Sequence, residues 1–402
     1  MSTAHLLPAF ARVDLAFDHG EGCWLTATNG ERYLDFTAGV AVNALGHAHP
    51  KVADAIASQA HKMIHVSNLF RVPEQETLAD RLCAECFADL VFFANSGAEA
   101  MEGAIKTARK FHAINGQPER YRIITFEGAF HGRTLATLAA GGNKKYLEGF
   151  GPVVEGFDQV PFGDLEAVKK VIGPETAAIL IEPIQGEGGV RVPTNQFLKS
   201  LRGLCDQHGL LLIFDEVQCG MGRSGELFAH QRTGVEPDVM ALAKALGGGF
   251  PVGAFLATKE AGKGMTAGTH GSTFGGNPLA MAAGNATLDV MLEPGFLDRV
   301  KRIGLLFKQR LAEIKDRYPN IIAEVRGEGL LLGLRCVAPN TQLVDALRDE
   351  HLLAVGAGEN VVRLVPPLIV SEEEVGQAMS MLDRACARLA RIETQAKQGA
   401  AV

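Results

Sequence analysis

Five short apolar runs, each followed at once by polar or glycine-rich sequence, restrict the fold of this chain more than any other feature. They lie at about residues 90–93, 123–126, 178–181, 210–214 and 239–242. Their apolar residues are continuous rather than alternating, as in strands covered on both faces. Helix-like segments alternate with the runs, which predicts an α/β fold with a mostly parallel, mixed sheet flanked by helices. Ligands of such sheets bind beyond the carboxyl ends of the strands, so the segments after the runs are expected to form one site.

The two ends of the chain have a different pattern of strand-like and helix-like segments. Strand-like segments at residues 24–28 and 32–36 flank Asn29 and Gly30, which is a strong hairpin signal. After about Pro294, a long amphipathic helix, several short strands and a final helix predict a smaller α+β domain. We expect residues 1–50 to join this small domain, residues 51–290 to form a large cofactor-binding domain, and residues 291–402 to form the small domain.

Charge and cysteine content exclude several classes of protein. The net charge of −7 argues against a nucleic-acid-binding protein. No apolar run reaches membrane-spanning length, and residues 1–10 lack the basic and apolar segments of an export signal. The seven cysteines are scattered, and neither Cys83 with Cys86 nor His47 with His49 has a further metal ligand at useful spacing. We therefore expect a reduced, cytoplasmic protein without a metal site.

A carboxylate and an amine follow the last two apolar runs. Asp215 comes directly after residues 210–214, and Lys244 stands 29 positions further on. That spacing suits one crossover between parallel strands, which would bring both side chains to the same edge of the sheet. A partly desolvated lysine can form a Schiff base, and an aspartate can hold a positive charge on a cofactor ring nitrogen. A solvated surface lysine is the alternative, but the apolar run before Lys244 and the glycines after it disfavour that reading.

Two other segments carry groups suited to a phosphate and a ring. Residues 95–100 (NSGAEA) open a helix, where free backbone N–H groups suit a phosphate. A plain helix cap by Ser96 with Glu99 is the alternative. Residues 130–134 (FHGRT) place Phe130 beside Arg133, which fits a stacking shelf and a carboxylate fork. A core phenylalanine with a surface arginine is the alternative there.

Three further segments contribute charges or hydroxyls. Glu187, in the glycine-rich residues 181–189, is either a counter-charge or an ordinary loop carboxylate. Ser272 and Thr273 either donate hydroxyls to a phosphate or cap a helix start. Arg363 lies inside an apolar strand-like run, where an arginine usually has a carboxylate partner.

Residues 220–225 (GMGRSG) match the G-x-G-x-x-G fingerprint of dinucleotide-binding enzymes. The glycines do not follow the strand directly, and no convincing helix begins after them. A dehydrogenase is therefore kept only as an alternative.

Together these motifs resemble those of the class III, ornithine-type aminotransferases of the fold-type I pyridoxal-phosphate superfamily. The resemblance runs from about Gly20 to Leu382 and rests on residues 96–100, 130–134, 215–218, 243–244 and 272–278. It implies pyridoxal 5′-phosphate as cofactor, small-molecule substrates, and a homodimer with shared active sites.

The resemblance also implies a role for each matching residue. Lys244 would bind the cofactor and move the proton of the reaction, and Asp215 would pair with the ring nitrogen. The other cofactor contacts would be Gly97, Ala98, Phe130, Glu216, Val217, Gln218 and, from the neighbouring subunit, Thr273.

The substrate contacts implied by the resemblance follow a similar logic. Arg133 and Ser272 would hold the acylated end of the substrate, and Arg363 the α-carboxylate of the amino acid. Glu187 would neutralise an arginine when one substrate has one carboxylate fewer.

Substrate choice depends on Gly39, where ornithine aminotransferases usually carry a tyrosine. A glycine leaves room for an acyl group, which favours transfer from an N-acylated ornithine to 2-oxoglutarate. Acetyl and succinyl remain open, as does action on N-succinyl-diaminopimelate. An ornithine or 4-aminobutyrate aminotransferase is the alternative within the class.

Overall fold

A seven-stranded sheet forms the centre of the computed structural model, which describes residues 5–399. Across the sheet, the order is β4 (Leu90–Ala94), β10 (Gly253–Ala257), β9 (Val239–Leu242), β8 (Leu211–Asp215), β7 (Thr176–Ile181), β5 (Arg122–Phe126) and β6 (Phe157–Val160). All five predicted runs are strands of this sheet. Only β10 runs against its neighbours, because it pairs antiparallel with both β4 and β9. The mostly parallel, mixed sheet expected from the sequence is therefore confirmed.

Strands β6 and β10 were not among the predicted runs. The sequence of β6, FDQV, has two polar residues of four, and β6 pairs only with β5 at one edge of the sheet. The sequence of β10, GAFLA, opens with a glycine directly after a glycine-rich turn. The β6 segment therefore lacks an apolar run, whereas residues 254–257 of β10 form one as long as residues 239–242 but stand directly behind glycines.

Both faces of the sheet are covered by helices, which explains the continuous apolar runs. On one face, α4 (Gly97–Ile114) packs against Ile213, Ala241 and Phe255. On the other face, α8 (Asn195–His208) packs against residues such as Leu212 and Phe214. Successive strand residues therefore alternate between two buried layers.

The remaining helices of this half surround the sheet. They are α2 (Pro50–Lys62), α3 (Pro73–Ala84), α5 (Leu135–Gly141), α6 (Lys144–Leu147), α7 (Leu165–Val171), α9 (Lys259–Gly262) and α10 (Pro278–Met291), with short 3₁₀ turns at η1 (Ala229–Arg232) and η2 (Lys244–Gly247).

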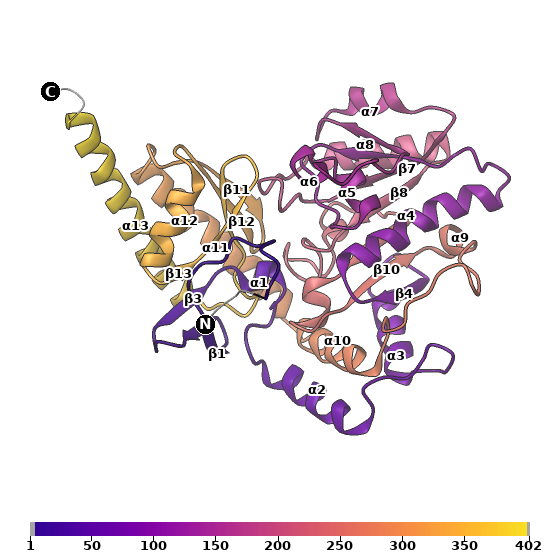
Figure 1. Cartoon of the computed structure of the whole chain (residues 1–402), viewed down its shortest axis with the longest axis horizontal. Helices are drawn as coiled ribbons and strands as arrows, with labels where there is room; N and C mark the ends of the chain where they lie inside the picture. The colour runs from indigo at the N-terminus through magenta and orange to yellow at the C-terminus, as the bar shows by residue number, and fades with distance from the viewer. Residues whose placement is uncertain (1–4, 400–402) are drawn as a thin grey trace.

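The C-terminal part is built on a second, antiparallel sheet and three helices. Its strands lie in the order β11 (Ile322–Glu328), β12 (Leu331–Cys336), β15 (Val361–Leu364) and β14 (Val355–Ala357). The helices are α11 (Phe296–Arg317), α12 (Asn340–Asp349) and α13 (Glu372–Gly399). Figure 1 shows this part beside, and distinct from, the half that contains β4 and β8.

The N-terminal hairpin belongs with the C-terminal part. Strands β1 (Phe17–Glu21), β2 (Trp24–Ala27) and β3 (Arg32–Asp35) are antiparallel, and β3 pairs in parallel with β13 (Leu352–Leu353). This pairing supports the predicted division at residues 50 and 290, which remains a prediction. Residues 1–4 and 400–402, at the outer ends of these predicted domains, lie outside the residues that the structure describes.

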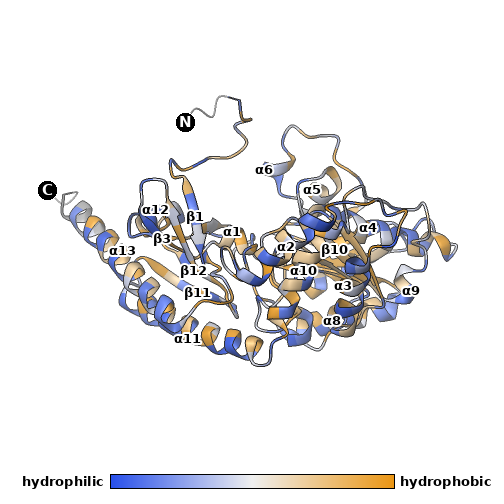
Figure 2. Cartoon of the chain, turned by 90° about the horizontal axis from the view of Figure 1, so that it is seen from below, coloured by the Kyte–Doolittle hydropathy of each residue, from blue (hydrophilic) through white to orange (hydrophobic). Residues whose placement is uncertain are grey.

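Colouring by hydropathy shows where the apolar side chains lie. In Figure 2, α11 and α13 carry both orange and blue stretches, as amphipathic helices do. The largest apolar cluster continues from the central sheet into the C-terminal part, where Phe36 and Phe307 meet edge to face with centroids 5.5 Å apart. Within residues 5–399, no helix is both long and apolar enough to span a bilayer.

Candidate active site

A cavity of about 440 Å³ lies at the carboxyl ends of the parallel strands. Its walls come from the segments that follow β4, β5, β7, β8 and β9, as the sheet topology predicts. The predicted site residues that line it are Gly97, Ala98, Phe130, Arg133, Glu187, Asp215, Val217, Gln218 and Lys244.

Asp215 and Lys244 meet at this cavity because their strands are neighbours. Asp215 is the last residue of β8 and pairs in register with Ala241 of β9, three residues before Lys244. Burial, and then the positive charge of Arg363, lower the pKa of Lys244 from 10.5 to about 8. The backbone of Lys244 is left-handed, with φ of 46°. Strained conformations of this kind persist only where the surrounding structure enforces them, and they are frequent at functional sites.

The carboxylate of Asp215 is held from two sides. The backbone N–H of Val217 donates to Oδ1 at 3.0 Å, and Nδ1 of His131 lies 2.7 Å from Oδ2. The side chain of His131 is fully buried. These contacts fix the direction of the carboxylate relative to the cavity.

Sequence reasoning assigned no role to two residues that shape this site, His131 and Glu182. Glu182 follows β7, lines the cavity, and accepts a hydrogen bond from the backbone N–H of Phe130 at 3.2 Å. Burial, and then the charge of Asp215, raise the pKa of Glu182 well above its usual value. The sequence did contain a signal for both residues: Glu182 directly follows the third apolar run, and His131 lies between the predicted site residues Phe130 and Arg133.

The start of α4 contains both the helix cap and the features of an anion site. Ser96 Oγ accepts from the N–H of Glu99 at 3.2 Å, and Glu99 Oε2 accepts from the N–H of Asn95 at 2.7 Å. Gly97 and Ala98 line the cavity, and their N–H groups belong to the first helical turn, which has no intrahelical acceptors. A methyl group on Gly97 would lie 2.8 Å from Val217 Cγ1, so the glycine keeps this wall open.

Arg363 carries the carboxylate partner that its position in an apolar strand predicts. Its side chain is 1% exposed; Nη2 lies 2.8 Å from Oε2 of Glu187, and Nη1 donates to Oε1 of Gln218 at 2.8 Å. Glu187 comes from the loop after β7, whereas Arg363 comes from β15 in the C-terminal part. The ion pair therefore joins the two halves of the molecule at the cavity.

Arg133 is exposed and stacks on aromatic rings. Its guanidinium carbon lies 3.7 Å from the ring centroid of Tyr146 and 5.6 Å from that of Phe130. Within the described part of the chain, no carboxylate pairs with Arg133. Its charge is therefore available to an anionic ligand.

Besides Arg363, three predicted residues lie outside the cavity lining. The carboxylate of Glu216 accepts from the N–H groups of Ala229 and His230, and burial raises its pKa to about 8. Its side chain is therefore engaged elsewhere, and a cofactor contact by it is not supported. Ser272 Oγ accepts from Gly275 N at 2.9 Å, and Thr273 is exposed outside the cavity.

Gly39 lies in an unusual turn beside the site rather than in its wall. Residues 38–41 all have positive φ, and Val42 immediately after them lines the cavity. Asp35 accepts from the N–H groups of Thr37 and Ala38 at 2.9 and 3.0 Å, which braces the turn. The left-handed backbone at position 39 favours glycine for a conformational reason, in addition to the room for an acyl group that the sequence suggested.

The glycine-rich residues 220–225 do not open a helix, which removes the structural context of a dinucleotide site. Arg223 within them is fully buried and donates to the carbonyls of Leu330 and Pro366. The segment connects the two halves of the molecule.

The residues present fit pyridoxal phosphate. A lysine with a lowered pKa faces the same cavity as an oriented carboxylate. Apolar side chains from Phe130 and Val217 and the free N–H groups of a helix start line the same space.

Comparison with known proteins gives a consistent result. The family model described as aminotransferase class-III matches residues 9–386. Acetylornithine aminotransferase 1 of Bradyrhizobium diazoefficiens is 68% identical over 391 residues, covering 97% of this chain and 96% of that protein.

Solved structures share the same fold. The ornithine aminotransferase of Toxoplasma gondii, solved with PLP at partial occupancy in its active site, superposes with a TM-score of 0.93 at 31% identity, covering 97% of this chain and 94% of that one. The N-acetylornithine aminotransferase of Stenotrophomonas maltophilia superposes with a TM-score of 0.84 at 36% identity, covering 95% and 98%.

Proposed function

The chain belongs to the class-III aminotransferases, which act with pyridoxal 5′-phosphate, and we propose that it transfers the δ-amino group of N2-acetylornithine to 2-oxoglutarate. The products would be N-acetylglutamate 5-semialdehyde and glutamate, as a step of arginine biosynthesis. The observation that carries the activity is the meeting of Lys244 and Asp215 at one cavity. The choice of donor rests on the 68% identity to an acetylornithine aminotransferase.

Each wall of the cavity would hold one part of the cofactor. When bound, pyridoxal phosphate supplies an electron-withdrawing ring that stabilises negative charge on the substrate carbon bearing the amine. Asp215, oriented by His131 and Val217, would accept a hydrogen bond from the ring nitrogen. Phe130 and Val217 would pack on the two ring faces. The N–H groups of Gly97 and Ala98 would donate to the phosphate.

Lys244 would bind the cofactor and move the proton at the reacting carbon. Its lowered pKa, about 8, leaves a larger neutral fraction near neutral pH than an exposed lysine has, and a neutral amine can accept that proton. Burial of the site by Ala243, Phe250 and Val252 would limit access of water.

Arg363 and Glu187 would distinguish the two substrates. The reacting carbon of 2-oxoglutarate bears a carboxylate, whereas the δ-carbon of acetylornithine bears none. The Glu187–Arg363 pair can persist with the donor, but it must open for Arg363 to bind the acceptor. Because Arg363 is already paired, we assign the donor's carboxylate to Arg133 rather than to Arg363.

We also propose a homodimer in the cytoplasm. Phe274, next to Thr273, is 59% exposed, and Leu69 and Phe70 nearby are 87% and 66% exposed. Asn68 donates to the carbonyl of Gly275 at 2.8 Å, so these side chains lie close together. A second copy covering this face would bring Thr273 to its neighbour's site. All seven cysteines are free, which suits a reducing compartment.

A panel of amino donors tests the proposed function. We expect a higher kcat/KM for N2-acetylornithine than for free ornithine or 4-aminobutyrate, measured as glutamate formed from 2-oxoglutarate. The purified protein should absorb in the visible or near-UV, and Lys244→Ala should lose both the activity and that absorbance, on the order of a thousandfold or more in rate. Preference for free ornithine would refute the assigned donor, and a colourless wild-type protein would refute the activity.

A further inference from the structure

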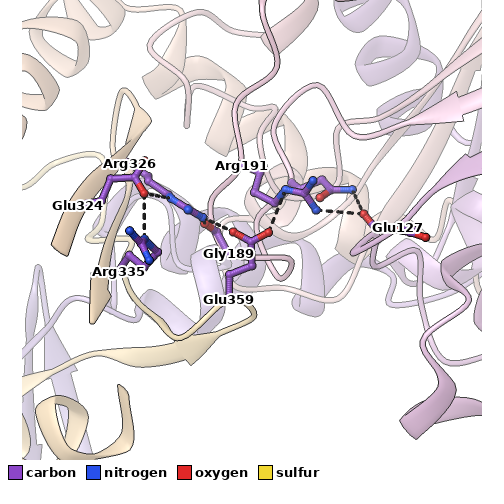
Figure 3. A network of polar contacts seen from close by, with 8 residues as sticks. Glu127, Gly189, Arg191, Glu324, Arg326, Arg335 and Glu359 are labelled. Atoms are coloured by element: carbon purple, nitrogen blue, oxygen red, sulfur yellow. Dashed lines mark hydrogen bonds and ion pairs between the residues drawn. The ribbon is translucent and has the colours of Figure 1, made fainter. Parts of the chain in front are cut away.

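A cluster of charged side chains lies between the glycine-rich loop after β7 and the C-terminal sheet (Figure 3). At its centre, Glu359 contacts two arginines: Arg191 of the loop, with Nε 3.4 Å from Oε1, and Arg326 of β11, which pairs with Oε2. On the far side, Glu324 accepts from Arg326 at 2.9 Å and from Arg335 at 3.0 Å. The cluster therefore bridges two parts of the chain that are far apart in the sequence.

Residues of this cluster and its neighbours also hold the backbone around Glu187. The N–H of Gly358 donates to the carbonyl of Glu187 at 2.7 Å, and Arg326 Nη1 donates to the carbonyl of Gly189 at 3.2 Å. Residue 359 thus follows directly after the main-chain partner of Glu187. Any change in the pairing of Glu359 acts close to the Glu187–Arg363 ion pair.

The turn that presents Glu359 is held firmly in a strained conformation. Glu359 and Asn360 have φ of 51° and 59°. The side chain of Asn360 donates to the carbonyls of Cys336 and Ala338 at 2.8 and 2.7 Å, and accepts from the N–H of Asn340 at 2.7 Å. A strained turn with this many contacts directs its side chains reproducibly.

Charge balance links Glu359 to the carboxylate in the active site. Glu187, Arg191 and Glu359 line one groove of about 480 Å³ next to the cavity. Arg191 is also fixed by the carbonyl of Glu127 at 3.2 Å, so it remains at the groove whatever its carboxylate partner. Glu359 places a negative charge beside Arg191, although it shares that charge with Arg326. Without Glu359, Glu187 is the other carboxylate that lines the groove.

We propose that Glu359 is a positioning residue for substrate discrimination: by pairing with Arg191, it leaves Glu187 free to pair with Arg363. This inference rests on the proposed function of the Glu187–Arg363 pair. Loss of the charge at 359 draws Glu187 toward Arg191 and frees Arg363. The enzyme then favours ligands with a carboxylate on the reacting carbon over the acetylated donor.

The Glu359→Gln variant tests this, with the two half-reactions followed separately by the absorbance of the bound cofactor. We expect KM for glutamate to fall and KM for N2-acetylornithine to rise, each by about two- to fivefold, the range of a partly exposed ion pair. The dissociation constant of glutarate, a non-reacting dicarboxylate, should fall by a similar factor, while kcat stays within about twofold.

Two further variants separate discrimination from a general structural effect. Glu324→Gln removes a carboxylate from the same cluster without touching Arg191, and it should leave the ratio of the two KM values unchanged. The double variant Arg191→Gln/Glu359→Gln removes both charges, and it should restore the wild-type ratio. Thermal unfolding of each variant reports on folding.

The inference is overturned if Glu359→Gln folds but keeps the wild-type ratio and glutarate affinity, or if the double variant fails to restore them. Should the wild type not use acetylornithine while Glu359→Gln still binds glutarate more tightly, the donor assignment fails and the role of Glu359 stands.

Discussion

At the scale of single residues, Lys244 combines burial with a strained backbone. Its side chain opens on a cavity lined largely by apolar groups, and its φ is 46°. Lys244 lies two residues after the end of β9 and lines the same cavity as Asp215. A lysine at this position costs stability, and the cost is consistent with a functional requirement.

The lowered pKa of Lys244 predicts how stability depends on pH when the cofactor is removed. The folded protein has a pKa near 8 at this group and the unfolded chain about 10.5, so between these values the unfolded chain binds more protons. Stability from this group therefore rises with pH across that window. We expect the destabilisation of the wild type relative to Lys244→Met to shrink from pH 8 to pH 10.5.

Urea unfolding of the cofactor-free proteins at several pH values measures this difference. Lys199→Met, at an exposed lysine of α8, is the control and should differ from the wild type by the same amount at every pH. A constant difference for Lys244→Met as well would contradict the argument.

At the scale of elements, α4 links the phosphate end of the cavity to the sheet. It begins at Gly97 in the cavity wall and packs along β10 and β9. Gly103 lies at this contact, where a methyl group would come within 2.2 Å of Phe255 Cε1. The close approach of helix and strand therefore requires glycine at this position.

Two glycine-to-alanine changes should have opposite effects. Gly103→Ala is expected to destabilise the protein by about 1–3 kcal/mol, because the helix must move away from Phe255. Gly203→Ala in α8 is the matched control: a methyl group there has nothing within 4 Å, and it should stabilise by up to about 1 kcal/mol. Urea unfolding measures both, and a neutral Gly103→Ala would contradict the packing argument.

At the scale of the whole molecule, the two halves of the chain meet beside the cavity. The loop after β7 supplies Glu187, and the C-terminal sheet supplies Arg363 and the turn at Glu359. Thr273 lies on an exposed face outside the cavity, so its predicted phosphate contact requires a second subunit.

Mixed dimers test this arrangement. Lys244→Ala and Thr273→Val are each expected to lose most activity. Refolding an equal mixture should recover about a quarter of the wild-type activity, because half of the dimers are hybrids with one intact site each. Mixing either variant with itself is the control. If hybrid dimers form but recover no activity, Thr273 contributes to the site of its own subunit or to no site.

How far the sequence alone reaches differs between parts of the site. The apolar runs predicted five strands and placed Asp215 and Lys244 at one edge, because strand order along the chain and the direction of crossovers are local properties. The sequence missed β10, whose apolar run stands directly behind glycines and whose pairing with β4 joins strands far apart in the chain. Glu182 and His131 were missed because each is a single polar residue whose partner comes from another strand.

The chain of amino acids by itself determined the fold class and most of the polar residues that line the cavity, since apolar runs and the polar residues that follow them occur in short segments. Only the tertiary structure decided which charge each arginine meets. Arg363 pairs with Glu187, 176 residues away, and Arg133 stacks on Tyr146 without a carboxylate partner among the described residues. Such pairings depend on distances between segments, and no local pattern encodes them.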